Sequence, residues 1–94
     1  MKQRWLKDWP WNTVVAINAA LCKEKRALHK PTSEGYKPAE KLWKESSKLE
    51  LTLREVFDVC RQCHKLAPFC FYNGNTFVAV GRTLIQDLLQ NCHR

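Results

Sequence analysis

Residues 51–68 read LTLREVFDVCRQCHKLAP, and this stretch contains the strongest structural signal in the chain. Thr52 and Glu55 have the spacing of a capping box, in which each side chain binds the backbone amide of the other residue at a helix start. Leu51 before the cap and Val56 after it form the apolar pair of a hydrophobic staple. The stretch therefore predicts a helix that starts directly after the cap and ends just before the closing proline, which cannot continue it.

Apolar residues recur at alternating spacings of four and three over residues 42–67, which would also suit one long helix. A capping box inside a continuous helix has no role, because it satisfies amides that only a helix start leaves free. We therefore expect two helices, the first from about Ala39 to Lys48 with Pro38 in its first turn.

Another helix is expected upstream, from an Asn12 cap to about His29. Its apolar side follows the helical period of 3.6 residues and consists of Val14, Ile17, Leu21 and Leu28. Residues 30–38 contain two prolines and a glycine and are expected to form a connector.

The C-terminal third allows two interpretations. Aromatic and β-branched residues flank Asn73-Gly74 within residues 69–80, which is typical of a β-hairpin. A helix capped by Asn75 would instead carry an apolar stripe of Phe77, Val80, Leu84, Leu88 and Cys92. We expect the helix, because a lone hairpin without a third strand is only marginally stable. The predicted fold is mainly α, a small single-domain bundle of about four helices, with an α+β fold containing the hairpin as the alternative.

The chain has 94 residues and 45% hydrophobic residues, which suits one folded domain over residues 1–94. No run approaches the roughly 18 apolar residues of a membrane-spanning helix, and no signal-peptide pattern is visible. We therefore expect a cytoplasmic protein that does not enter a membrane. Its five cysteines, an odd number, are then expected to be thiols rather than a disulfide framework.

Residues 1–11 form an arm with three of the four tryptophans, Trp5, Trp9 and Trp11, between basic residues. Large indole rings bury much surface at the edge of a small domain. Exposed rings beside cations would instead stack on nucleic-acid bases. We expect the packed arrangement; an exposed arm would serve as a contact to a protein partner or to a second copy of the chain.

Cys60, Cys63 and His64 form a C-x-x-C-H motif, the sharpest chemical pattern in the chain. The motif resembles the haem-attachment site of cytochromes c, which implies a haem electron carrier with two thioether bonds and a histidine iron ligand. The same residues with Cys92 would alternatively hold a structural zinc ion. We expect a third arrangement, in which the cysteines belong to the core and the histidine is a cation near a helix C-terminus, with no cofactor.

A second polar cluster precedes the last predicted helix. Backbone amides of Asn73, Gly74 and Asn75 would bind an anion there, with Arg82 as the counter-charge. Turn residues of this kind also serve simply as helix caps, so the same pattern is also explained without an anion.

The formal net charge of +7 favours an acidic partner. No P-loop, dinucleotide fingerprint or catalytic triad is recognisable, so we expect a non-catalytic binding or interaction module. Nucleic acid is the most concrete acidic partner. The expected contacts share two predicted helices and their connector, and they are Lys23, Lys25, Arg26, Lys30, Lys41, Lys44 and Lys48.

Overall fold

The computed structural model describes residues 2–92, and this part of the chain forms four helices without a strand. In chain order they are α1 (Trp11–Lys25), α2 (Tyr36–Ser47), α3 (Leu53–Leu66) and α4 (Asn73–Cys92). The mainly α prediction is confirmed, and so is the expectation that two helices, rather than one, occupy the middle of the chain. Among the described helices, none combines the length and the apolar character needed to cross a membrane.

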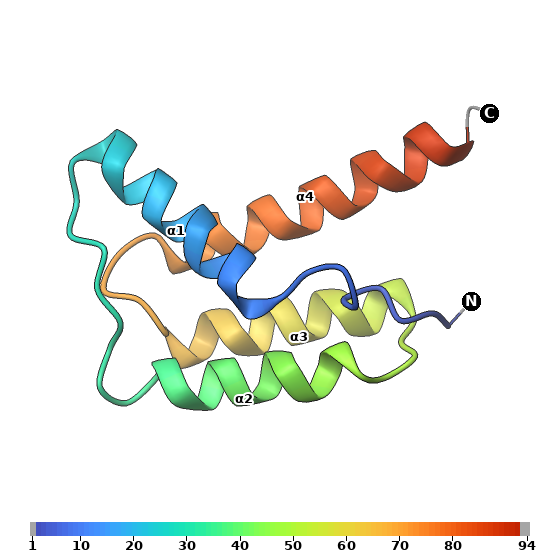
Figure 1. The fold of residues 1–94 in the computed structure, drawn as a ribbon, viewed down its shortest axis with the longest axis horizontal. Helices are drawn as coiled ribbons and strands as arrows, with labels where there is room; N and C mark the ends of the chain where they lie inside the picture. The colour runs from blue at the N-terminus through green and yellow to red at the C-terminus, as the bar shows by residue number, and fades with distance from the viewer. Residues whose placement is uncertain (1, 93–94) are drawn as a thin grey trace.

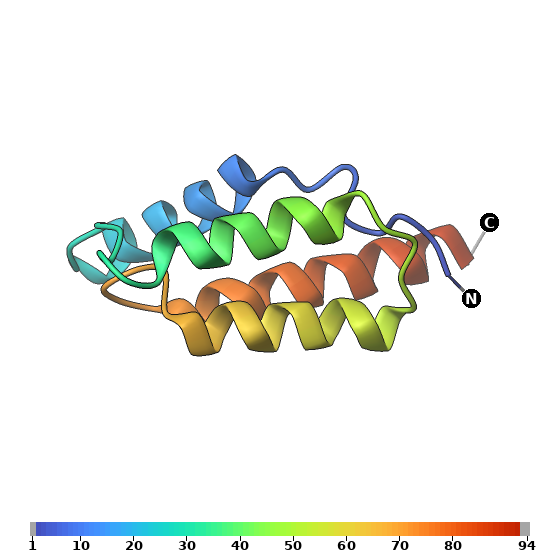
Figure 2. The same ribbon diagram turned by 90° about the horizontal axis from the view of Figure 1, so that it is seen from below.

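The helices form two layers. α2 and α3 run antiparallel side by side, and α1 and α4 lie across them (Figure 1). The same arrangement seen from below shows α4 running alongside α3 in the opposite direction, with α1 on the side of α2 (Figure 2). α1 packs mainly on α4 and less extensively on α2.

The capping box at the start of α3 is present as predicted. The Thr52 amide donates to Glu55 Oε1 at 2.9 Å, and the Glu55 amide donates to Thr52 Oγ1 at 3.1 Å. Leu51 and Val56 are both buried, as expected for a hydrophobic staple. These hydrogen bonds to the Thr52 backbone and side chain lower the pKa of Glu55, because they stabilise its charged form.

Removing this cap should weaken the fold in a pH-dependent way. Thr52→Ala is expected to lower the free energy of unfolding by about 1 kcal/mol, the usual cost of losing a helix cap. The stabilising effect of Glu55 over an E55A variant should be fully present at neutral pH and disappear as the pH falls through the lowered pKa. Urea denaturation from neutral to acidic pH measures both effects. A Glu55 effect that stays constant over this range would contradict a role for its carboxylate.

α1 differs from its predicted bounds at both ends. The helix already begins at Trp11, so Asn12 lies inside the first turn instead of capping it. It ends well before His29, because Arg26 adopts a left-handed conformation with φ 56°. Leu28 therefore lies beyond the helix and is 59% exposed, whereas the sequence placed it on the apolar side.

The buried side of α1 is also turned relative to the prediction. Val14 is buried as expected, but Ile17 and Leu21 are only half-buried. Asn18 and Cys22 are the fully buried residues in the following turns. A polar side chain in this position was missed because periodicity arguments count only apolar residues.

α2 and α4 each begin about three residues earlier than predicted. Tyr36 starts α2, and Pro38 is tolerated in its first turn, where a proline removes no intrahelical bond. α4 starts at Asn73, whose side chain accepts from the Phe69 amide at 2.9 Å and donates to the Phe69 carbonyl at 2.7 Å. Asn75 therefore does not cap the helix, and the alternative hairpin is absent, because this turn packs back on the preceding loop.

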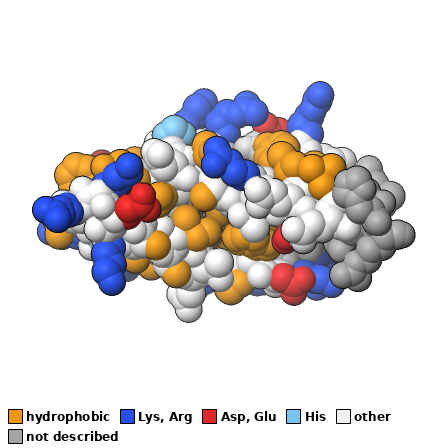
Figure 3. Space-filling view, turned by 90° about the horizontal axis from the view of Figure 1, so that it is seen from above, with side chains coloured by type: hydrophobic (Ala, Val, Ile, Leu, Met, Phe, Trp, Pro, Cys, Tyr) orange, Lys and Arg blue, Asp and Glu red, His pale blue; other side chains and the backbone are white. Residues whose placement is uncertain are grey.

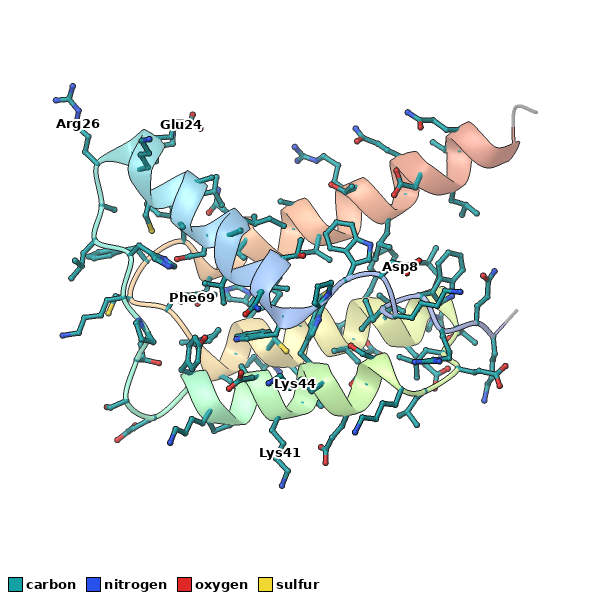
Figure 4. The ribbon with its side chains drawn as sticks, viewed as in Figure 1. Asp8, Glu24, Arg26, Lys41, Lys44 and Phe69 are labelled. Carbon is teal, nitrogen blue, oxygen red and sulfur yellow. The ribbon has the colours of Figure 1, made fainter. Side chains whose placement is uncertain are left out.

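An aromatic cluster fills the space between the layers. Phe69, labelled in Figure 4, is its central ring: it stacks on Trp11 with an interplanar angle of 8° and meets Tyr36 edge-on. Trp43 of α2 lies 6.3 Å from Trp11 and 6.1 Å from Phe77 between ring centroids. Offset and edge-to-face pairs of this kind stabilise a core by roughly 0.5–1.5 kcal/mol each beyond the buried area.

The N-terminal arm packs against the bundle. Gln3 and Leu51 exchange two backbone hydrogen bonds of 2.9 and 2.7 Å. The Trp43 indole donates to the Trp9 carbonyl at 2.7 Å, and the Trp11 ring is buried in the core. The packed arrangement of the tryptophans is therefore confirmed, and the core includes an arm that has no helical periodicity.

The two longer loops pair with each other at one end of the bundle. Pro31 and Phe69 form an antiparallel bridge, and the Thr32 hydroxyl donates to the Ala67 carbonyl at 2.6 Å. Gly35 lies directly on this contact: a Cβ added to it would be 2.5 Å from the Ala67 carbonyl oxygen and still closer to that of Leu66. Only glycine lets the start of α2 approach the end of α3 this closely.

A buried hydrogen-bond network joins α1 to the start of α4. The Asn18 side-chain amide donates to the Phe71 carbonyl at 2.8 Å and to Thr76 Oγ1 at 3.0 Å. Its oxygen lies 2.8 Å from His29 Nδ1 and accepts from the Cys22 thiol at 3.5 Å. Since this oxygen can only accept, His29 carries a proton on Nδ1. All hydrogen-bonding groups of the buried Asn18 side chain are thus used.

Candidate binding groove between α3 and α4

An apolar groove of about 520 Å³ runs along the outer junction of α3 and α4. In Figure 3, which looks down on the α1–α4 layer, hydrophobic side chains form a patch bordered by Lys and Arg side chains. The apolar part of the lining comes from both helices and consists of Phe57, Cys60, Phe77, Val78, Gly81 and Ile85.

Two glycines of α4 shape the groove. A Cβ at Gly81 would lie 3.2 Å from Cε1 of Phe57, so the missing side chain lets the Phe57 ring lie against the α4 backbone. A Cβ at Gly74 would lie 3.2 Å from Cε1 of His64. From the sequence alone, Gly81 is simply a residue of low helix propensity inside a helix. In the structure it sets how closely the two walls of the groove approach.

Several large apolar side chains on this side of α4 remain in water. Val78 is 56% exposed and Ile85 is 40% exposed, and both line the groove. Leu89 follows Ile85 by one helical turn and is also exposed. Scattered exposed apolar residues are ordinary, but a contiguous apolar stripe with a polar border is typical of an interaction surface.

The polar border of the groove includes two arginines. Arg61 and His64 come from α3, and Arg82 and Gln86 come from α4 on the other wall. Arg61 also forms an ion pair of 2.9 Å with Asp58, which reduces its local positive charge as the pair with Glu40 does for Lys44. Among the described side chains that line the groove, none is a carboxylate. An occupant with an apolar centre and acidic edges would therefore match this surface.

The predicted anion site is only partly assembled. Gly74, Asn75 and Arg82 line a second, smaller pocket of about 300 Å³ next to the groove. Asn73 does not line this pocket, and its side chain is bonded to the Phe69 backbone. Three of the four predicted residues therefore share one pocket, and anion binding there stays a prediction.

The residues of the C-x-x-C-H motif face different parts of the structure. Cys60 and His64 line the groove, whereas Cys63 is fully buried and its thiol donates to the Ala39 carbonyl of α2 at 3.8 Å. Burial raises the pKa of Cys60 to about 11 and that of Cys63 to about 12, so both are neutral thiols at physiological pH. Haem attachment through both thiols would require α3 to separate from α2.

No three His, Cys, Asp or Glu side chains lie together as metal ligands in the part of the chain that the structure describes. The side chain of Cys92, the proposed fourth zinc ligand, lies outside the described residues. A zinc site built on Cys60, Cys63 and His64 therefore stays a prediction that elemental analysis of the purified protein would check.

The thiols should differ strongly in their reactivity. Among the thiols that the structure describes, only Cys70 is exposed, and we expect iodoacetamide to modify it before the other three in the native protein at mildly alkaline pH. Cys60 and Cys63 should react only on unfolding, because they are buried and their thiolates are scarce. Peptide mass spectrometry after timed labelling measures the order, with labelling in urea as the control. Native modification of Cys60 as fast as that of Cys70 would contradict the buried arrangement.

The seven predicted basic contacts do not share one face. Arg26 at the end of α1 and Lys41 on α2 project from opposite sides of the molecule (Figure 4). Lys44 is paired with Glu40 at 3.0 Å, which reduces its local positive charge. Of the remaining predicted contacts, Lys23 and Lys25 lie in the last turn of α1, Lys48 caps the end of α2, and Lys30 lies in the loop between these helices.

No protein-family model, curated protein or solved structure matches this chain. Sequence reasoning selected Arg82, His64 and Cys60, but it did not predict that they line a common groove. Phe57, Val78 and Ile85 were not among the predicted site residues. Their partial exposure depends on what the other helices leave uncovered, which no single-helix pattern contains.

Proposed function

We propose that the protein is a non-catalytic binding module that receives an acidic partner in the groove between α3 and α4. The observation that carries this proposal is the apolar groove with cations on both walls, Arg61 on α3 and Arg82 on α4. Burial of Val78 and Ile85 would supply most of the binding free energy, at about 25 cal/mol per Å² of apolar surface. The cations would select for acidic partners and speed association.

The groove also favours an apolar acidic partner over nucleic acid. A nucleic-acid backbone is bound mainly by cations that follow its phosphates, and it gains little from an open aliphatic surface. The basic residues that were expected to contact phosphates lie on opposite sides of the bundle, as Arg26 and Lys41 illustrate. The proposed partner is therefore one that buries carbon surface and presents carboxylates.

The groove can be tested with a small probe of the same chemistry. Anilinonaphthalene sulfonate joins an aromatic body to one anionic group, and its fluorescence rises when it leaves water. We expect saturable binding to the folded protein and about five- to tenfold weaker binding to Arg82→Glu, equivalent to roughly 1 kcal/mol. Lys41→Glu is the matched control, since it makes the same charge change away from the groove and should leave the affinity unchanged.

Two results would overturn this proposal. The first is probe binding that responds equally to Arg82→Glu and Lys41→Glu, or to neither. The second comes from mobility shift with short single-stranded and double-stranded oligonucleotides at about 150 mM salt, where surface charges are screened beyond roughly 8 Å. A complex that persists there and is weakened by Lys41→Glu alone would replace the groove with a nucleic-acid surface on α2.

A further inference from the structure

We infer that the occupant of the groove is an amphipathic α-helix of a partner protein, with carboxylates on both edges of its apolar stripe. This inference rests on the proposed function and specifies its partner. It follows from three properties of the groove: its shape, its openness to solvent and the placement of its charges.

The shape of the groove matches a helix. Its lining extends along α4 from Gly74 to Ile85, which corresponds to about 16 Å at 1.5 Å per residue. α3 forms the other wall and runs antiparallel to α4. An added helix of three turns would lie between these two and bury its apolar side as in ordinary helix packing.

The exposure of the lining argues against a small ligand. Small-molecule sites bury most of the ligand surface in a concave pocket. Here Val78 and Ile85 are both exposed to water on one wall, at 56% and 40%, and Leu89 continues the apolar stripe beyond the hollow. A compact ligand in the hollow would leave Leu89 uncovered, whereas a longer helix would cover it.

The charges specify the edges of the partner helix and argue against self-association. Arg61 lies on the α3 wall and Arg82 on the α4 wall, so the matching helix carries Asp or Glu on each side of its apolar stripe. Two copies of this groove placed face to face would bring their cationic borders together, and like charges at an interface are unfavourable. A partner of opposite charge therefore fits better than a second copy.

Peptide display on the full chain tests this inference. We expect a random library of peptides of about 15 residues to yield sequences with apolar residues at i, i+4, i+7 and i+11 and a net negative charge. A synthetic peptide from this set should gain helical circular dichroism on binding, with a dissociation constant on the order of micromolar. Val78→Asp should weaken binding at least about tenfold, because it places a desolvated carboxylate in the stripe.

Matched variants distinguish peptide binding in the groove from nonspecific binding to other exposed apolar residues. Leu49 is 54% exposed, much like Val78, but it lies outside the groove, so Leu49→Asp should leave peptide affinity unchanged. Arg82→Glu should weaken the binding of an acidic peptide, and a lysine placed at the facing position of the peptide should restore the affinity. This charge reversal cannot be produced by a change in the stability of the protein alone.

The outcomes distinguish the inference from the proposed function. Dye binding that requires Arg82, without any selected acidic helical peptide, would overturn the helix and leave the groove as a receptor for another acidic ligand. Dodecanoate binding more tightly than every selected peptide would assign the site to a small amphiphile. A dimer in light scattering that Val78→Asp dissociates would assign it to a second copy. Dye binding insensitive to Arg82→Glu would overturn the proposed function itself.

Discussion

Gly35→Ala is expected to be the most destabilising small substitution in the chain, with a loss of about 3 kcal/mol or more of unfolding free energy. The added Cβ would overlap the Leu66 carbonyl and lie 2.5 Å from the Ala67 carbonyl oxygen. Both obstacles are backbone atoms at the end of α3, so no side-chain rotation relieves the overlap. Overpacking of a rigid site costs roughly 1–3 kcal/mol and more when the backbone must move.

The shift of α2 away from α3 that Gly35→Ala requires should also disturb the loop contacts around Gly35. Its amide donates to Thr32 Oγ1 at 3.2 Å, and the same hydroxyl donates to the Ala67 carbonyl. Moving α2 away from α3 therefore weakens hydrogen bonds in addition to packing. For a domain of this size, a loss of about 3 kcal/mol lowers the melting temperature by about 10–20 °C, which differential scanning calorimetry would measure.

Gly74→Ala is the control for this prediction. Its Cβ would meet only the imidazole of His64, at 3.2 Å, and this exposed side chain can turn away. Alanine also has a higher helix propensity than glycine by about 1 kcal/mol, so the variant should be neutral or slightly more stable. If the two alanine variants had the same stability, the close approach of α2 to α3 would be wrong.

Asn18→Ala is expected to produce the second large loss, about 2–4 kcal/mol. The substitution leaves a cavity in a fully buried position and removes the partner of several polar groups. The Phe71 carbonyl loses the donor that Asn18 provides, and His29 Nδ1 loses its acceptor. Urea denaturation followed by tryptophan fluorescence would measure the loss in unfolding free energy.

The effect of Asn18→Ala should be concentrated at the α1–α4 contact. The network joins the middle of α1 to Thr76 in the first turns of α4. Amide hydrogen exchange should therefore accelerate in α1 and at the start of α4 before it does so in α2 and α3. Uniform acceleration over all four helices would contradict a local role for this network.

Asn12→Ala provides the matched control on the same helix. Asn12 is exposed and no side-chain cap bond forms at the start of α1, so its removal should change the unfolding free energy by less than about 0.5 kcal/mol. A loss of about 1 kcal/mol or more would instead support the original prediction that Asn12 is the cap. The pair thus tests the network and the corrected helix start together.

The predicted helix starts are accurate where the hydrogen bonds that define them join residues close together in the chain. The start of α3 was predicted correctly because Thr52 and Glu55 bond only to each other. The start of α4 was placed three residues late, because Asn73 bonds to Phe69, whose position depends on the bridge to Pro31. Local hydrogen bonds are readable from spacing, whereas bonds between distant segments are not.

The candidate site, too, could be predicted from the sequence only in part. The positive charge and the motif at Cys60 were visible in the sequence, and they favoured an acidic partner or a metal. The structure turns Cys63 away from Cys60 into the α2 contact and places Arg82 opposite Arg61. Which residues share a surface depends on how α3 and α4 pack, and this packing depends on the close contact between Gly81 and Phe57.

By itself, the sequence determined that the chain is helical and where its clearest helix begins, because periodicity and capping act within one or two turns. It also determined the excess of positive charge that disfavours basic partners. Only the tertiary structure decided that Asn18 is buried, that Gly35 tolerates no side chain and that Val78 and Ile85 stay uncovered. These properties arise from contacts between segments far apart in the chain, since burial depends on every neighbouring element and not on the residue alone.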